Sequence, residues 1–268
     1  MTDVRDVLFR DIGQKRFHAT LTAERAGVLC GKAEALAKAA ELGVELEICK
    51  EDGDDLSHGQ VFANFSGTPK QIAMAEEQLI GVMAKASGIA TAARTAVLLA
   101  DGKIRIVSGA WKKMPPELKN LVRKAVTTGG AAARITDPPM IYMDKNFVRM
   151  LGSVRAAMEA AAQLDGAKKI VQLRGETASI ADEARQAAAG GANIVMVDTG
   201  RQEDLIACVE TLKALGCREK MEVAFAGNLT VTDIPHIAAL GADAVDIGRE
   251  IIDAPLLDMR LDVVGEDA

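Results

Sequence analysis

Six short apolar runs, separated by Ala-rich stretches of helical character, constrain this chain more than any other sequence feature. Runs of five to eight residues that are apolar almost throughout are typical of strands buried on both faces. Strands that alternate with helices in this way form parallel βα units. The pattern therefore predicts a parallel sheet covered by helices. The runs are residues 104–109, 140–144, 169–175, 193–200, 222–228 and 244–248.

The ends of these runs favour a barrel over an open sheet. Several end in small or polar residues, such as Ser-Gly, Asp-Thr-Gly and Ala-Gly-Asn. Such endings are typical of barrels whose functional loops lie at the carboxyl ends of the strands. The first run is not followed by the GxGxxG pattern of dinucleotide-binding sheets. We therefore expect an α/β barrel from about residue 104 to 250.

The first third of the chain predicts a small, separate α+β unit. Residues 18–30 and 44–49 show the apolar alternation of half-buried strands, and residues 61–67 are strand-like. The Ala/Leu-rich segment between the first two predicts a helix that ends at Gly43, because glycine is common at helix C-termini. Residues 51–60 form a polar cluster that we interpret as a solvated hairpin loop rather than a calcium loop, whose ligand spacing they lack.

From about residue 70 the sequence predicts a long or broken helix, with Ser87-Gly88 as a plausible break. No run here approaches 18 uncharged apolar residues, so we expect no membrane span. The N-terminus lacks the apolar core of a signal peptide. A cytoplasmic location is the resulting expectation.

Composition excludes other classes. The chain of 268 residues is 49% hydrophobic and 26% charged, which is ordinary for a globular protein. A net charge of −6 and 3% aromatic residues argue against a nucleic-acid partner. The four cysteines form no CxxC pair and only three histidines accompany them, so we expect reduced thiols and no zinc site.

Charged residues follow several of the predicted strands. Because parallel strands in a barrel end at one rim, these side chains are expected to converge on one pocket. Several cations beside one carboxylate suit a phosphorylated or carboxylated ligand. Taken singly, each also has a structural interpretation, as a solvated helix-flanking charge, a loop residue or a helix N-cap. The candidates are Lys112, Lys113, Arg134, Lys145, Arg174 and Asp198, together with Gly227 and Gly248.

Read in order, several segments resemble the quinolinate phosphoribosyltransferase family, the carboxylating nicotinate-nucleotide pyrophosphorylases. The resemblance covers almost the whole chain. SGIAT after an acidic helix is a hallmark of the family, and KKMPPELKNLVRKAVTTGG is similar to its TRKTxPGLRxLxKxAVxxGG. MDKNF resembles KDNH, VDTG resembles LDN, and IGREIIDAPLLDMRLDV resembles VGxLTHSAxxLDxSLD.

The resemblance implies an architecture and an activity. It implies an N-terminal α/β sandwich over residues 1–85, an incomplete parallel α/β barrel over residues 86–254, and a tail of residues 255–268 that returns to the sandwich. It also implies a homodimer or higher homo-oligomer. Family members transfer phosphoribosyl from phosphoribosyl pyrophosphate to quinolinate in NAD biosynthesis and bind Mg²⁺ with the pyrophosphate.

The family's site residues carry over only in part. Lys113, Lys145 and Asp198 fall on the motifs and are the expected catalytic residues, with Asp198 also the expected metal ligand. The resemblance places the substrate-binding positions at Lys112, which replaces an arginine, and at Arg134, Gly227, Asn228 and Gly248.

Three departures alter the acceptor end of this site. Glu77 stands where the family has an arginine donated by the partner subunit, Arg174 where it has a glutamate, and Ile252 where it has a histidine. Quinolinate carries two carboxylates, which paired arginines bind best. The sequence therefore predicts a phosphoribosyltransferase with a changed acceptor.

Two alternatives stay open from the sequence. The first is a non-catalytic homologue that binds a phosphorylated metabolite. The second is a Schiff-base enzyme that uses a desolvated Lys145 or Lys113 on the same barrel. Fold alone does not decide between them.

Overall fold

The computed structural model describes residues 3–266, which divide into two compact units. The antiparallel unit comprises the chain up to Arg94, residues 114–130 and the chain from Ile251 onwards. The parallel unit comprises residues 95–113 and 131–250. Each unit is described by itself.

The parallel unit contains one six-stranded sheet whose pairings are all parallel. The strand order is β6-β11-β10-β9-β8-β7, so β6 and β7 form its two edges. Every run that the sequence predicts to be a strand contains one, and the predicted fold class is confirmed. The strands are β6 (Arg105–Val107), β7 (Met140–Met143), β8 (Lys168–Leu173), β9 (Ile194–Asp198), β10 (Glu222–Ala226) and β11 (Ala244–Asp246).

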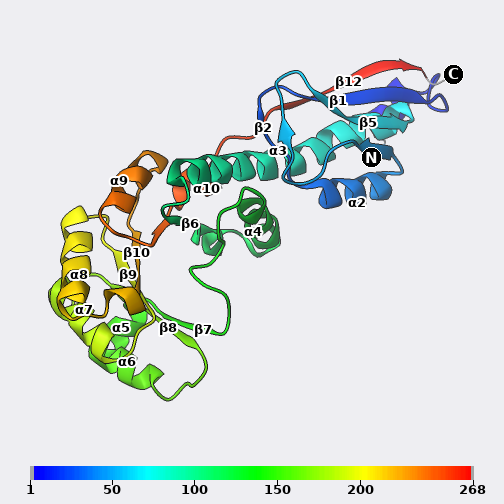
Figure 1. The fold of residues 1–268 in the computed structure, drawn as a ribbon. Coiled ribbons are helices and arrows are strands. Elements are labelled where there is room, and N and C mark those ends of the chain that lie inside the picture. Colours follow the sequence, from blue (N-terminus) through cyan, green and yellow to red (C-terminus); the bar gives the residue numbers. More distant parts are fainter. Residues whose placement is uncertain (1–2, 267–268) are drawn as a thin grey trace. The chain divides into compact units, whose positions relative to one another are not determined.

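Helices cover one side of this sheet, and a small apolar cluster fills the other. Figure 1 shows the helices between successive strands lying together along the outer side of the sheet. The inner cluster is built mainly from alanine, isoleucine and methionine side chains. Together these side chains occupy little volume on the inner face of the sheet. The covering helices are α5 (Lys145–Leu151), α6 (Val154–Ala161), α7 (Ile180–Ala189), α8 (Gln202–Ala214) and α9 (Ile234–Ala239).

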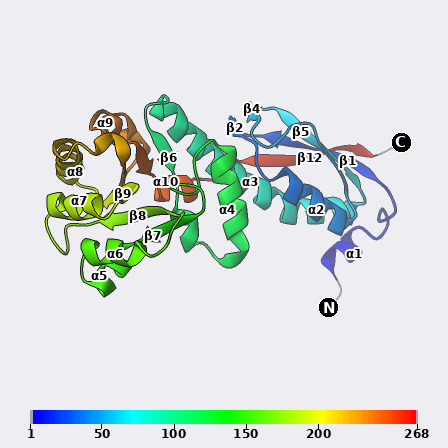
Figure 2. The ribbon, with the colours of Figure 1, turned by 60° about the horizontal axis from the view of Figure 1, so that its bottom comes forward.

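The antiparallel unit is built on a four-stranded sheet of order β12-β1-β5-β3. The C-terminal strand β12 lies beside β1, although some 240 residues separate them, with Leu21 opposite Leu261 (Figure 2). Helix α2 (Lys32–Leu42) ends at Gly43, whose φ of 69° is the left-handed conformation that glycine adopts readily. The strands are β1 (Phe17–Ala23), β3 (Glu45–Ile48), β5 (Val61–Gly67) and β12 (Met259–Glu266).

Short elements complete the described chain. Helix α1 (Val4–Leu8) precedes β1, and β2 (Gly27–Val28) pairs with β4 (Asp55–Leu56). The remaining elements are η1 (Ala110–Lys113), η2 (Pro116–Leu118), α4 (Lys119–Thr128), η3 (Arg218–Lys220), η4 (Val231–Asp233) and α10 (Arg249–Ile252).

Helix α3 (Pro69–Ala100) is the one described helix long and apolar enough to span a membrane by length and composition. Half of its most apolar window is buried within the protein. Ala75, Leu79 and Met83 lie in the main core of the antiparallel unit, packed with Phe62 and Phe65. Its apolar character is therefore that of a core helix.

Of the two predicted alternatives the long helix is confirmed, because α3 runs through Ser87-Gly88 without interruption. Ser87 is buried, and its hydroxyl accepts a hydrogen bond from the backbone N–H of Cys30 and donates one to its carbonyl. A Cβ on Gly88 would stand 2.1 Å from the carbonyl oxygen of Pro255. The two small residues admit neighbouring backbone rather than breaking the helix.

This contact gives a stability prediction. We expect Gly88→Ala to lower the free energy of unfolding by about 1–3 kcal/mol, the usual cost of overpacking, because the obstructing atoms are backbone. Gly81→Ala is the matched control on the same helix. Its Cβ would meet nothing within 4 Å, so helix propensity alone should stabilise it by about 1 kcal/mol. Urea unfolding of both variants checks the difference, and equal effects would contradict the packing argument.

Candidate active site

The alternation of side chains along the strands brings polar groups to the inner face at the carboxyl ends. Ile194 and Met196 belong to the inner cluster, so Asp198, two residues further on, points to the same face. Ala244 places Asp246 there in the same way. Ala226 of β10 pairs with Asp198 of β9, and β11 adjoins β10 on its other side. The two carboxylates thus flank β10, with Cα atoms about 10 Å apart at two strand spacings.

Asp198 is held in place by neighbouring side chains. Its Oδ2 accepts a hydrogen bond from Arg174 Nη1 at 2.9 Å and another from the side-chain amide of Gln172. Arg174 Nη1 also donates to the carbonyl oxygen of Asp198 at 2.8 Å. The Arg174 and Asp198 side chains are 31% and 25% exposed, so the pair is shielded but open to a ligand.

Gln172 links this pair to the start of α5. Its Oε1 accepts a hydrogen bond from the backbone N–H of Lys145 at 2.5 Å, while its amide donates to Asp198. The same side chain therefore fixes the N-terminal end of α5, and with it the starting point of the Lys145 side chain, relative to Asp198. Sequence reasoning missed Gln172, although it occupies the position two residues before Arg174 on the same face.

Glu183 fixes the loop that carries Arg174. It is 1% exposed, and its Oε2 accepts hydrogen bonds from the backbone N–H groups of Arg174 and Gly175, both at 2.9 Å. Its Oε1 accepts from the backbone and the hydroxyl of Thr177. Three backbone donors and a hydroxyl thus satisfy one buried carboxylate, which holds the β8–α7 loop in one conformation. Arg174 is preorganised as a result.

We call the inner face of the sheet at the carboxyl ends of its strands the mouth. Beside Asp198, it contains a small pocket of about 80 Å³ around Asp246. Trp111 and Tyr142 contribute aromatic walls, with Arg134 over the Trp111 ring at 5.7 Å from its centre and Lys112 over the Tyr142 ring at 5.0 Å. These are cation–π distances. Two of the predicted rim cations therefore meet the same pocket.

Asp246 is the half-buried carboxylate of this pocket. Burial raises its pKa above the ordinary value, and the charge of Asp198 acts in the same direction, while the Gly109 N–H, Lys112 and Lys113 oppose the shift. Burial likewise raises the pKa of Tyr142, so its hydroxyl stays protonated at neutral pH. Asp246 was not among the predicted site residues, although an acid at the end of a buried strand is a sequence signal for a functional group.

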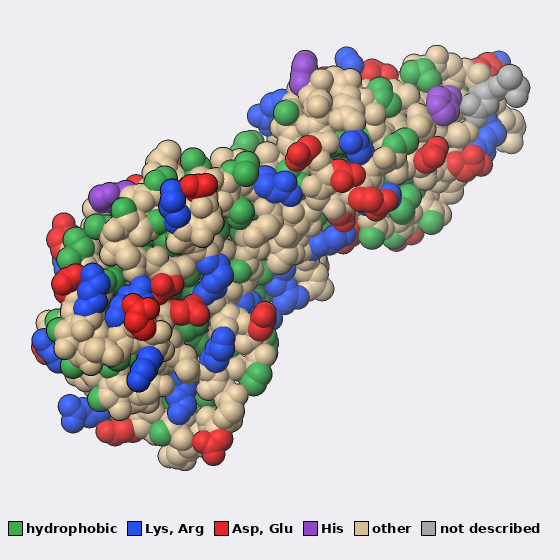
Figure 3. Space-filling model, viewed as in Figure 1, with side chains coloured by type: hydrophobic (Ala, Val, Ile, Leu, Met, Phe, Trp, Pro, Cys, Tyr) green, Lys and Arg blue, Asp and Glu red, His purple; other side chains and the backbone are tan. Residues whose placement is uncertain are grey.

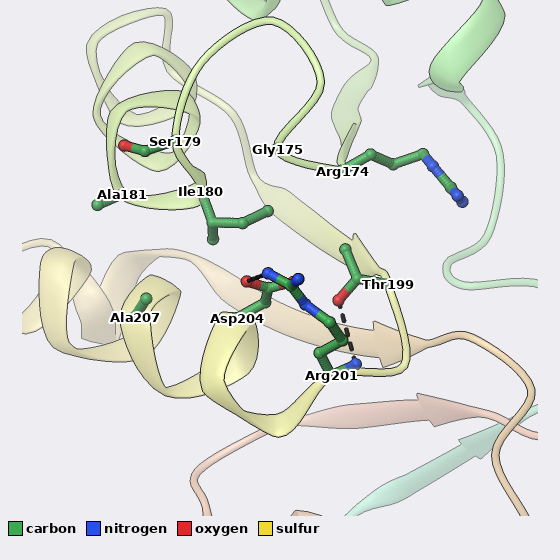
Figure 4. Close-up of a pocket in the computed structure, with 9 residues that line it drawn as sticks. All are labelled: Arg174, Gly175, Ser179, Ile180, Ala181, Thr199, Arg201, Asp204 and Ala207. Atoms are coloured by element: carbon green, nitrogen blue, oxygen red, sulfur yellow. Dashed lines mark hydrogen bonds and ion pairs between the residues drawn. The ribbon is translucent and has the colours of Figure 1, made fainter.

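A larger groove of about 500 Å³ lies between the loops that follow β8 and β9. Figure 4 shows Ile180 pointing toward Asp204, which is paired with Arg201, while Arg174 points away from both. Arg201 and Asp204 neutralise each other's charge, so neither is left to bind a charged ligand in the groove. We therefore place the functional groups at the mouth rather than in this groove.

Glycines shape the backbone beside the mouth. Gly227 has φ 125°, and a Cβ there would stand 2.2 Å from the backbone N of Gly200. Only glycine fits this close approach of the loops after β9 and β10. Asn228 follows in the left-handed region, with its side chain accepting from Arg249 at 3.3 Å. Gly248 lies against Ala110, because a Cβ on Gly248 would stand 3.4 Å from the Cβ of Ala110.

The remaining predicted residues differ in their surroundings. Lys113 is exposed in η1, and Lys145 is half-buried as the first residue of α5. The N-cap interpretation of Asp198 is wrong, since α8 begins after Arg201 without a side-chain cap. Glu77 lies in the antiparallel unit on α3, 62% exposed and ion-paired with Arg5.

The donors around Asp198 do not suit a magnesium ion held by the protein. Asp198 Oδ2 already accepts from a guanidinium and an amide, so a magnesium ion bound to this carboxylate would lie close to the positive charge of Arg174. Across residues 3–266, His, Cys, Asp and Glu side chains form no group of three that could hold a metal. No step below is assigned to a metal.

Charges of both signs are mixed over the surface. On the face drawn in Figure 3, basic and acidic side chains alternate over both units without a broad basic field. This mixture agrees with the net charge of −6.

A helix-covered parallel sheet whose carboxyl-end face combines guanidinium, ammonium and carboxylate groups has the chemistry to bind a small anionic metabolite. Two family models match the chain. The C-terminal domain of quinolinate phosphoribosyl transferase matches residues 89–262, and its N-terminal domain matches residues 5–87. The chain belongs to the quinolinate phosphoribosyltransferase family.

Curated relatives agree with this assignment, and a solved structure agrees with the fold. A probable carboxylating nicotinate-nucleotide pyrophosphorylase of Archaeoglobus fulgidus is 30% identical, with 94% of this chain and 96% of the relative covered. The carboxylating enzyme of Rattus norvegicus is also 30% identical, over 95% of this chain and 84% of its own. The structure of the Pyrococcus furiosus nicotinate-nucleotide pyrophosphorylase superimposes with a TM-score of 0.83 at 22% identity, covering 100% of this chain and 75% of that one, and supports the fold.

Proposed function

We propose that this chain is a phosphoribosyltransferase that transfers phosphoribosyl from phosphoribosyl pyrophosphate to a small, pyridine-like acceptor other than quinolinate. The observation that carries the proposal is Asp198, held at the barrel mouth by Arg174 and Gln172 within a chain of this family. A fixed carboxylate can stabilise the positive charge that develops on the ribosyl carbon as pyrophosphate leaves.

The other mouth residues supply position and charge. Lys113 and Lys145 neutralise the departing pyrophosphate, and the turn at Gly227 and Asn228, which packs closely on the backbone of Gly200, borders the site of the 5-phosphate. Catalysis of this kind needs preorganised charge and little covalent chemistry from the protein. The enzyme acts as a homodimer in the cytoplasm, with Glu77 of the partner subunit facing the acceptor.

One observation favours a second candidate, the non-catalytic homologue. Arg174 already satisfies Asp198, so the carboxylate carries a counter-charge before substrate arrives. A protein that only binds a phosphorylated metabolite would tolerate that pairing. The Schiff-base alternative has weaker support, because Lys113 is exposed and thus lacks the desolvation that activates such lysines.

Calorimetry with phosphoribosyl pyrophosphate tests the proposal. We expect binding, and we expect less than a tenfold loss of affinity, or about 1.4 kcal/mol, when magnesium is omitted, because Arg174 already stands beside Asp198. Pyrophosphate release with a panel of pyridines then separates an enzyme from a binding protein. Absence of binding in both conditions would refute both candidates, and binding without release for any acceptor would favour the second.

A further inference from the structure

The pocket around Asp246 has a chemistry that the proposed function leaves unused. Asp246 Oδ1 accepts a hydrogen bond from the backbone N–H of Gly109 at 3.1 Å. Among the residues that the structure describes, its Oδ2 has no hydrogen-bond partner. Asp246 is half-buried and lines the pocket, so this oxygen is open to a ligand that brings a donor.

The size of the pocket limits what can enter. Its volume of about 80 Å³ is well below the 300–1,000 Å³ that encloses a drug-sized ligand. It corresponds to the liquid volume of about three water molecules at roughly 30 Å³ each. A nucleotide cannot fit, whereas one edge of a small ring with its substituent can.

The walls favour a flat, apolar ring. Trp111, Tyr142, Met140 and Met196 line the pocket, and the Trp111 indole N–H is bound to the carbonyl of Ala133 at 2.6 Å. That bond fixes the plane of the indole. Aromatic rings pack against one another by offset or edge-to-face contact, so these walls suit an aromatic guest.

The cations of the pocket do not compete for its interior. Lys112 is exposed and lies over the face of Tyr142, and Arg134 lies over Trp111. Solvent screens the charge of the exposed Lys112, and the half-buried guanidinium of Arg134 is held over the Trp111 ring. Asp246 is therefore the charged group that meets whatever part of the ring enters most deeply.

From this geometry we propose that Asp246 is the specificity-determining residue for the acceptor. It selects a small aromatic heterocycle whose inward substituent is an N–H donor, such as an amide or amine. A heterocycle that carries a carboxylate at that position is disfavoured. The inference rests on the proposed phosphoribosyl transfer for its place in the reaction. The recognition itself depends only on the pocket. An amide N–H completes the hydrogen bonding of Asp246 Oδ2, while a carboxylate would meet like charge and an unpaired acceptor.

A purely structural role must be distinguished from this one. Asp246 could serve only to tie the β6 end to β11 through Gly109. Such a role predicts that substituting Asp246 weakens the binding of every ligand by the same factor. A specificity role predicts opposite changes for two ligands of the same shape.

Nicotinamide and nicotinate are the matched probes, since they differ only in amide against carboxylate. We would titrate each into the full chain by calorimetry, with inorganic pyrophosphate present, for the wild type, Asp246→Asn and Asp246→Ser. The wild type should bind nicotinamide at least about tenfold more tightly than nicotinate. Both variants should bind nicotinate more tightly and nicotinamide more weakly, which shifts the ratio by at least about tenfold. Asp243→Asn, at the start of the same strand, should leave the ratio unchanged.

Separate titration of phosphoribosyl pyrophosphate keeps the two proposals apart. If that ligand fails to bind the wild type but the probe ratio shifts, the recognition by Asp246 stands and the proposed function falls. A preference for nicotinate in the wild type, binding of neither probe, or equal weakening of both in the variants would overturn the role of Asp246.

Discussion

Replacing Asp198 by asparagine should lower kcat/KM for phosphoribosyl pyrophosphate by about 100- to 1,000-fold, the range seen when one preorganised electrostatic group is removed from an active site. Asparagine keeps the shape of the side chain and can still accept a hydrogen bond from Arg174 or Gln172. It removes the negative charge that the developing positive charge of the ribosyl group needs. Steady-state kinetics of pyrophosphate release measure the loss.

Asp243 provides the matched control for this substitution. Like Asp198 it forms a 2.9 Å ion pair, here with Arg218, and its Oδ2 also accepts from the backbone N–H of Val223 at 2.7 Å. It precedes β11, at the amino ends of the strands, where barrel residues contribute stability rather than chemistry. Asp243→Asn should lower the melting temperature without lowering kcat/KM. A similar loss of activity in both variants would contradict the catalytic role of Asp198.

The fold could be predicted because its determinants are local. Each buried strand has its own apolar run, and each helix has apolar residues at helical spacing. All six parallel strands could therefore be predicted from the sequence. The sequence left a long and a broken helix open for α3, because it does not show that Gly88 serves a contact with Pro255, far away in sequence. A glycine that admits distant backbone and a glycine that ends a helix look alike in one sequence.

The candidate site could be predicted only in part. Arg174 and Asp198 follow strands as charged residues, so the convergence of strand ends pointed to them. Gln172 and Asp246 were missed because they lie within or at the end of apolar runs, where a single polar residue passes as part of a strand. Glu183 was missed because it lies on a helix, and only the folded loop shows that its carboxylate meets three backbone donors.

Quinolinate should be a poor acceptor, with kcat/KM no more than about 1% of that of the rat enzyme assayed in parallel. Its second carboxylate needs a cation, but Arg174 is already bound to Asp198 and Glu176, and Glu77, which is paired with Arg5, brings a carboxylate rather than a cation from the partner subunit in the proposed dimer. Like charges across an interface cost several kcal/mol, and each 1.36 kcal/mol is tenfold in rate. A cost of twice 1.36 kcal/mol therefore lowers kcat/KM about 100-fold.

Reversing the two charges tests this explanation. The variant that combines Glu77→Arg with Arg174→Glu should raise kcat/KM for quinolinate at least about tenfold, because it returns a cation to the acceptor and a carboxylate to the position beside Asp198. Glu77→Gln is the control, since it removes the repulsion without adding an arginine fork and should give a smaller gain. Wild-type turnover of quinolinate within about 1–1,000 per second would show that these substitutions are tolerated. If neither variant gains activity, the charge exchange is not what excludes quinolinate, and the carboxylate of Asp246 inside the pocket becomes the remaining barrier to test by adding Asp246→Ser to the exchange.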